Sequence, residues 1–194
     1  MDYRWKIRMM MKKILLYISI FLLGTIPFYG QQGIYKTENA IIKFDAAKGN
    51  IEPIKAENIK AKLILKDSTG EIACLMDMTN FEFPNKLMQE HFNENYIESD
   101  QYPKASFSGK IDNFINTDFS KEQTLNLKGE FKIHGVSLTK TIPISVLKLN
   151  NTYNIKSNFN LQIKDFDIKI PSIMFYKIAE EVNVNLTAEL KELQ

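Results

Sequence analysis

The chain has 194 residues, with 25 Lys/Arg against 23 Asp/Glu, 44% hydrophobic residues and a single cysteine. This length allows one domain with a substantial core, and one cysteine excludes an intramolecular disulfide framework. No stretch rich in Pro, Gly or Ser divides the sequence, so we expect one domain.

Residues 1–30 have the pattern of a secretory signal peptide. They hold five Lys/Arg ahead of the apolar run Ile14–Leu23, which is shorter than the roughly 20 residues of a membrane span. Translation starts at Met1 or Met11, and an uncleaved amphipathic anchor is the alternative interpretation. We expect export to the periplasm or full secretion, with residues 31–194 as the mature domain and no membrane-spanning segment after signal removal.

Removal of the signal changes the charge of the protein. Residues 31–194 contain 20 basic and 22 acidic residues, a net charge of −2. A nearly neutral domain lacks the concentrated positive surface by which proteins bind nucleic acid. We therefore expect no nucleic-acid partner.

The mature sequence alternates with period two, as half-buried β-strands do. The chain turns at Asp67–Gly70, at His134–Gly135 and at Asn150–Asn151, which all have residues typical of tight turns. The alternation predicts strands over Ala40–Asp45, Ile59–Leu65, Ile72–Met78, Ala105–Ile111, Leu125–Ile133, Ile142–Val146, Tyr153–Leu161 and Val182–Leu190.

Short turns between half-buried strands indicate antiparallel hairpins, because parallel strands need long crossovers. The fold class is therefore mainly β. The pattern fits either a sandwich or a closed barrel of about eight strands, which is wide enough to be filled by side chains or to hold one small ligand.

One segment, near residues 84–97, departs from the β pattern. Its spacing predicts a short amphipathic helix with Pro84 in the first turn, and Pro103 ends the segment before the next strand. The residues that share one side of this helix are Leu87, Met88, His91, Phe92 and Tyr96.

Residues that carry chemistry are few. The two histidines, His91 and His134, fall in different settings, and no zinc-binding spacing, P-loop or G-x-S-x-G motif is present. Glu90 and Glu94 fit a solvated helix face, and Cys74 fits a buried, inert thiol. We expect no catalysis, no metal site and no required cofactor, with hydrolysis at His91 or Glu90 as a remote alternative.

The sequence is instead rich in apolar bulk, with 13 Phe, 8 Met and 8 Tyr. An ordinary packed core is the simplest use of these side chains. In a barrel, Met88 and Phe92 on a capping helix can also line an elongated apolar cavity.

Two motifs resemble those of the YceI-like family of secreted lipid- and polyisoprenoid-binding proteins. The first is Met88–Ile111, a helix followed by a Tyr-Pro turn and an Ala-x-Phe-x-Gly/Ser type of strand. The second is Leu127–Ile144, which matches the family hairpin at Gly129, Ile133, Gly135, Val136 and Lys140. Lys164–Leu186 resembles the closing region, although Asp167 replaces a glycine there, and the only tryptophan, Trp5, lies in the signal.

The resemblance implies a single antiparallel lipocalin-like β-barrel, closed at one end by the helix near 84–97. It also implies an isoprenoid chain, such as a quinone tail or polyprenyl lipid, inside the barrel. The chain is then a binder or carrier of a long apolar lipid. The alternative is an envelope stress or interaction protein with a filled core, and a homodimer stays open. The predicted cavity-lining residues are Met88, Phe92, Phe107, Leu127, Phe131 and Phe159.

Overall fold

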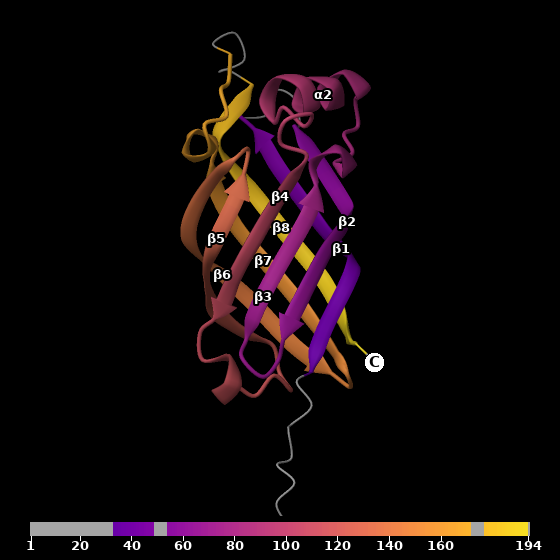
Figure 1. Cartoon of the computed structure of the whole chain (residues 1–194), viewed down its shortest axis with the longest axis vertical. Coiled ribbons are helices and arrows are strands. Elements are labelled where there is room, and N and C mark those ends of the chain that lie inside the picture. Colours follow the sequence, from indigo (N-terminus) through magenta and orange to yellow (C-terminus); the bar gives the residue numbers. More distant parts are fainter. Residues whose placement is uncertain (1–32, 49–53, 172–176, 194) are drawn as a thin grey trace, which may run out of the picture. The chain divides into compact units, whose positions relative to one another are not determined.

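Eight strands form one closed antiparallel barrel in the computed structural model, which describes residues 33–48, 54–171 and 177–193 (Figure 1). Each strand pairs with the next one along the chain, and β8 returns to pair with β1. Closure confirms the barrel and removes the outer edges that an open sheet leaves exposed. The strands are β1 (Ile34–Ala47), β2 (Lys55–Lys66), β3 (Glu71–Asp77), β4 (Lys104–Ile111), β5 (Gln123–Ile133), β6 (Val136–Leu149), β7 (Thr152–Gln162) and β8 (Ile178–Glu192).

Strand boundaries differ from the prediction where pairing overrides the local pattern. β1 begins at Ile34, well before the predicted start at Ala40, because it pairs along its length with both β2 and β8. β3 ends at Asp77, and Met78 opens a short 3-10 helix, η1 (Met78–Asn80), instead of continuing the strand. The predicted signal segment, residues 1–30, lies outside the described residues.

The predicted inward position of Ile59 in β2 is wrong. Its side chain is 47% exposed, because the register with β1 shifts by one residue between Ala61 and Asn58 and forms a β-bulge. Asn58 takes the inward position and is fully buried. Its amide is satisfied, since Oδ1 accepts from the Lys60 N–H at 2.9 Å and Nδ2 donates to the Asp77 carbonyl at 3.0 Å.

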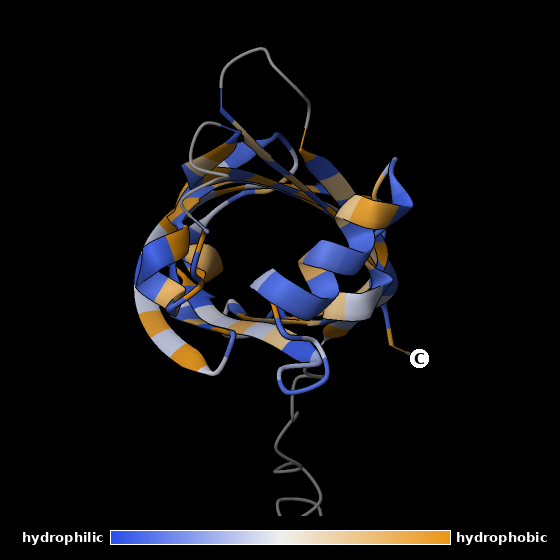
Figure 2. Ribbon diagram, turned by 90° about the horizontal axis from the view of Figure 1, so that it is seen from above, coloured by the Kyte–Doolittle hydropathy of each residue, from blue (hydrophilic) through white to orange (hydrophobic). Residues whose placement is uncertain are grey.

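One end of the barrel carries the predicted helix, which consists of α2 (Lys86–His91) and a wider π-helical turn, η2 (Phe92–Tyr96) (Figures 1 and 2). The side chain of Asn85 caps α2 by accepting hydrogen bonds from two N–H groups of its first turn. Pro84 therefore lies before the cap, not in the first turn as predicted. The π turn closes with a 2.9 Å bond from the Ile97 N–H to the Phe92 carbonyl.

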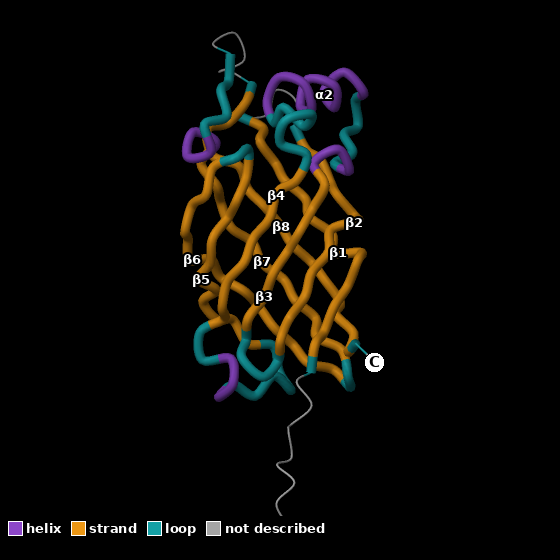
Figure 3. The backbone as a smooth tube through the Cα atoms, viewed as in Figure 1, coloured by secondary structure: helices purple, strands orange, loops and turns teal. Residues whose placement is uncertain are grey.

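Two further helical turns lie beyond the strand ends (Figure 3). η3 (Phe114–Asn116) follows β4 at the end opposite α2, and η4 (Ile163–Phe166) follows β7 at the same end as α2. Among the described residues, no helix combines the length and the apolar character that crossing a bilayer requires.

The barrel end opposite α2 is filled by packed side chains. The rings of Tyr35 and Tyr153 meet edge to face at 4.7 Å, and those of Phe114 and Phe119 are also 4.7 Å apart. The Lys148 ammonium lies over both tyrosine rings, 4.9 and 4.5 Å from their centroids, where cation–π attraction holds it. The most deeply buried aliphatic side chains of this half are Leu65, Ile111, Ile144, Val146, Ile155 and Leu190.

Candidate functional site

An apolar cavity of about 260 Å³ occupies the barrel half next to α2. All eight strands contribute to its wall, and α2, η2 and η4 contribute to its rim. This volume lies just below the usual range of roughly 300–1,000 Å³ for small-molecule sites. The interior is thus packed in one half and hollow in the other.

All six predicted cavity-lining residues border this cavity. Phe107, Leu127 and Phe131 are buried wall residues on β4 and β5, whereas the remaining three are partly exposed. Contact of any of them with a ligand remains a prediction. The three that are partly exposed are Met88 on α2, Phe92 on η2 and Phe159 on β7.

Three phenylalanines form a continuous aromatic wall across β4, β5 and β7. The ring centroid of Phe131 lies 4.6 Å from that of Phe107 and 5.5 Å from that of Phe159. The Phe107 ring lies against Gly109 and Gly129, which face each other across β4 and β5. A Cβ added at Gly129 would lie 2.5 Å from the Phe107 ring, so glycine is required there for this ring position.

A second aromatic cluster fixes the helical cap to the barrel. Phe92 lies 5.1 to 5.9 Å, between ring centroids, from Phe44, Phe81 and Phe83. The strand prediction ended β1 near Phe44 but did not connect it with Phe92, because the loop that brings Phe81 and Phe83 under η2 has no periodic pattern.

Polar groups border the cavity mainly near α2. His91, Tyr96 and Gln162 line this part, and burial raises the pKa of the Tyr96 phenol above its ordinary value, so its hydroxyl is a hydrogen-bond donor well beyond neutral pH. Leu87, by contrast, is 57% exposed and does not line the cavity. Leu87 therefore does not lie on the cavity side with the other residues that its spacing grouped on one side of the helix.

His134 joins the turn after η2 to the η4 turn. Its Nδ1 donates to the Phe166 carbonyl at 3.0 Å, and its Nε2 lies 2.8 Å from the Glu98 carboxylate. The ring also stacks against Tyr102, at 4.4 Å between centroids. His134 has φ of 51° and Gly135 has φ of 76°, so the predicted tight turn is confirmed.

We expect His134→Ala to lower the free energy of unfolding by about 2 kcal/mol, because it removes one bond to a charged group and one to a buried carbonyl. Urea denaturation monitored by circular dichroism measures the change. The matched control is Lys132→Ala, which truncates an exposed side chain of the same hairpin. Equal losses in the two variants would show that His134 does not clamp the cap.

Cys74 faces the cavity and is 7% exposed, as the prediction of a buried thiol requires. Burial raises its pKa to about 12, so the neutral thiol dominates at pH 8.

We expect alkylation of Cys74 by iodoacetamide to accelerate about tenfold per pH unit from pH 8 to 10 in the folded protein. In urea-unfolded protein the rate should level off near pH 9, and a similar levelling in folded protein would contradict this assignment.

No group of three His, Cys, Asp or Glu side chains that could hold a metal ion occurs within residues 33–48, 54–171 and 177–193.

Solved structures share this barrel at low sequence identity. A polyisoprenoid-binding domain from Saccharophagus degradans, implicated in plant cell wall breakdown, superposes with a TM-score of 0.72 at 11% identity, covering 84% of this chain and all of that domain. Burkholderia cenocepacia BcnA gives 0.64 at 16% identity, covering 78% and 95% of the two chains. The YceI protein of Campylobacter jejuni gives 0.59 at 13%, covering 76% and 90%.

Comparison with curated proteins gives no match. The model of the YceI-like domain, however, matches residues 28–190, which include β1 to β7 whole and all of β8 except its last two residues. The structural neighbours show the fold alone, because their identities are so low, whereas the family model spans most of the sequence. The chain therefore belongs to the YceI-like family.

Proposed function

We propose that this protein binds a long apolar lipid of the isoprenoid type and carries it without covalent chemistry. The observation that supports this most directly is the apolar cavity of about 260 Å³ in a barrel whose other half is fully packed. The Saccharophagus degradans domain of the same fold is a polyisoprenoid-binding domain, which supports the same class of ligand here.

Burial of hydrocarbon supplies the affinity in this proposal. Each CH₂ group transferred from water to an apolar site contributes roughly 0.8 kcal/mol, so a few isoprene units suffice for tight binding. The aromatic wall of Phe107, Phe131 and Phe159 offers flat surfaces to such a chain, and Met88 and Phe92 cover it from the cap.

The head group of the lipid belongs at the α2 end, where the polar lining residues are. The Tyr96 hydroxyl and the His91 imidazole line the cavity and supply hydrogen-bonding groups for a carbonyl or hydroxyl, as in a quinone or a prenyl alcohol. Gln162 is already engaged, since its Nε2 donates to Glu181 at 2.6 Å.

The proposal includes a location outside the cytoplasm. We propose that residues 1–30 direct export and are removed, so that residues 31–194 act in the periplasm or after secretion. The basic stretch followed by an apolar run supports this. N-terminal sequencing of the protein from its native envelope tests the location and the cleavage position together.

Mass spectrometry of organic extracts tests the ligand. The protein is purified from its native envelope without detergent, extracted, and compared with protein that has been delipidated and refolded. We expect one apolar lipid near one equivalent in the first sample, and saturable rebinding of that lipid to the second. Absence of both would reject lipid binding.

A filled-core interaction protein remains the second candidate, and the packed half of the interior is the observation in its favour. Homodimerisation is a prediction, for which sedimentation velocity is the measurement. Cross-linking in intact cells tests the interaction protein, which should yield one dominant protein partner.

A further inference from the structure

Backbone pairing between β6 and β7 ends halfway along the barrel. The two strands pair only between Ser145–Leu149 and Thr152–Lys156. Beyond that point, residues 136–144 of β6 pair with β5 alone, and residues 157–162 of β7 pair with β8 alone. We call the boundary between residues 136–144 and residues 157–162 the seam.

Pro143 explains why the pairing stops. In an antiparallel pair, every second residue exchanges backbone hydrogen bonds with the partner strand. Counting from the Leu149–Thr152 pair that closes the hairpin, Pro143 is the next residue due to bond across to β7, opposite Asn158. Proline has no N–H to donate, so the ladder ends at Ser145.

Side chains, not backbone groups, bridge the seam. The Ser157 hydroxyl donates to the Pro143 carbonyl, which the missing ladder leaves available. Further along, the Lys140 ammonium donates to the Asn160 carbonyl at 2.8 Å. Single side-chain bonds of this kind contribute about 1 kcal/mol each, so the seam is held far more weakly than a continuous ladder.

Another ladder that ends early, between β2 and β3, is continued by backbone hydrogen bonds beyond its last pair. Pairing of these strands ends at Lys62 and Leu75. Beyond it, Glu57 and Glu82 exchange two backbone hydrogen bonds of 3.1 and 2.8 Å, and the Asn58 amide bonds the Asp77 carbonyl. Backbone hydrogen bonds therefore continue across the β2–β3 boundary, whereas side-chain bonds bridge the seam.

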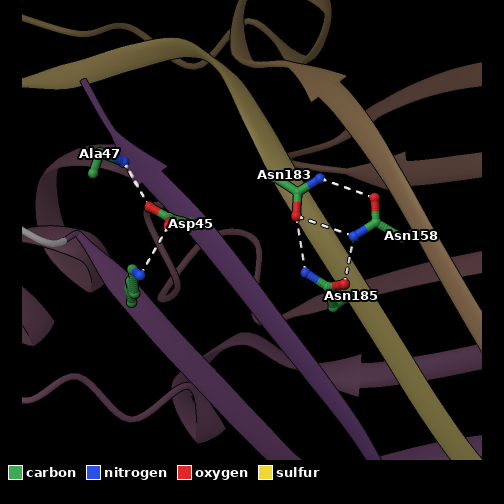
Figure 4. Close-up of polar contacts among 6 residues, drawn as sticks. Asp45, Ala47, Asn158, Asn183 and Asn185 are labelled. Carbon is green, nitrogen blue, oxygen red and sulfur yellow. Dashed lines mark hydrogen bonds and ion pairs between the residues drawn. The ribbon is translucent and has the colours of Figure 1, made fainter. Parts of the chain in front are cut away.

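Both strands at the seam are firmly held on their other sides. β6 pairs with β5 through eleven residue pairs, from Ile133–Val136 to Gln123–Val146. On the outer face, Asn158 of β7 exchanges amide hydrogen bonds of 3.3 and 3.2 Å with Asn183 of β8 (Figure 4). β7 is therefore held to β8, and β6 to β5, more strongly than β6 and β7 are held to each other along the seam.

The cavity lies directly behind the seam. Ile142 on one edge and Ser157, Phe159 and Leu161 on the other edge all line it. The cap at the barrel end, by comparison, is fixed by the aromatic cluster around Phe92. Among the described residues around the cavity, the weakly paired part of the wall is thus the seam, at the side of the barrel and not at its capped end.

We propose that the seam between β6 and β7 is a lateral port through which the lipid chain enters and leaves the cavity. This inference rests on the proposed lipid binding. Separation of the two strands breaks the Lys140–Asn160 and Ser157–Pro143 links and leaves the rest of the barrel paired. The lipid chain passes between the two strands into the cavity, and the two links then re-form.

Stopped-flow fluorescence with the N-methylanthraniloyl ester of farnesol tests the port. Pro143→Val restores an N–H that can donate to the Asn158 carbonyl and extends the ladder. We expect it to slow both association and dissociation about two- to tenfold, the equivalent of one backbone hydrogen bond, with little change in Kd. Lys140→Met should accelerate both rates. Lys128→Met, on the outer face of β5, is the matched control and should change neither.

Amide hydrogen exchange provides a readout that does not depend on the probe. The Thr139 and Thr141 amides point into the seam by the same alternation and should exchange rapidly in the wild type. Their exchange should slow in Pro143→Val. Normal Kd with unchanged rates in both seam variants would overturn the port but leave lipid binding intact. Failure of the wild type to bind the probe, or any extracted lipid, would overturn both.

Discussion

Ala105→Phe is expected to abolish lipid binding while the barrel remains folded. Ala105 is buried in the wall of the cavity, on β4 beside Phe107. A phenyl ring at this position projects into the cavity and excludes about four CH₂ groups of a bound chain, or roughly 3 kcal/mol of transfer free energy. Affinity should therefore fall more than about 100-fold.

The same substitution should change the stability by no more than about 1 kcal/mol, because the ring fills existing space instead of overpacking a dense core. Fluorescence titration of delipidated protein measures the affinity, and thermal denaturation measures the stability. The matched control is Ala73→Phe, which adds the same ring to the half-buried outer face of β3. Full binding by Ala105→Phe would show that lipid does not occupy this cavity.

Two truncations on β7 should separate the packed half of the barrel from the hollow half. Ile155 is 1% exposed and lies in the packed half, whereas Leu161 is 8% exposed and borders the cavity. We expect Ile155→Ala to lower the free energy of unfolding by about 4 kcal/mol and Leu161→Ala by about 2 kcal/mol. The difference arises because a side chain beside empty space has fewer neighbours to lose.

Thermal denaturation by calorimetry distinguishes these two variants. For a domain of this size, a difference of about 2 kcal/mol corresponds to roughly 4–8 °C in Tm. A saturating apolar ligand should raise the Tm of Ile155→Ala more than the Tm of Leu161→Ala. Leu161 borders the cavity and would contact the ligand, whereas Ile155 lies in the packed half. Equal destabilisation of the two variants would contradict the division of the interior.

Periodicity predicted the antiparallel strands and much of the interior, whereas the choice of a closed barrel over a sandwich rested on the family resemblance. The alternation of β7 placed Tyr153, Ile155 and Leu161 inward, and all three are buried. Each strand of such a sheet keeps its phase as long as the pleat is regular. Where the pleat breaks, the phase is lost: one extra residue in β2 turned Ile59 outward and brought Asn58 into the core.

The division of the interior could not be predicted from single strands. Phe159 and Tyr153 occupy equivalent inward positions on β7, yet one borders the cavity and the other packs against Tyr35. What fills the barrel at each level depends on all eight strands together. Pro143 is the sequence signal for the end of the β6–β7 ladder, since a proline inside a strand cannot donate to a neighbouring strand.

The packed end also limits what the barrel can do with a chain. Tyr35 and Tyr153, with Lys148 above their rings, leave no passage beyond the cavity. A lipid held there therefore cannot be passed from one end of the molecule to the other. In the proposed carrier function, uptake and delivery therefore use the half of the barrel that holds the cavity, and a membrane or enzyme that exchanges lipid with the protein approaches that half.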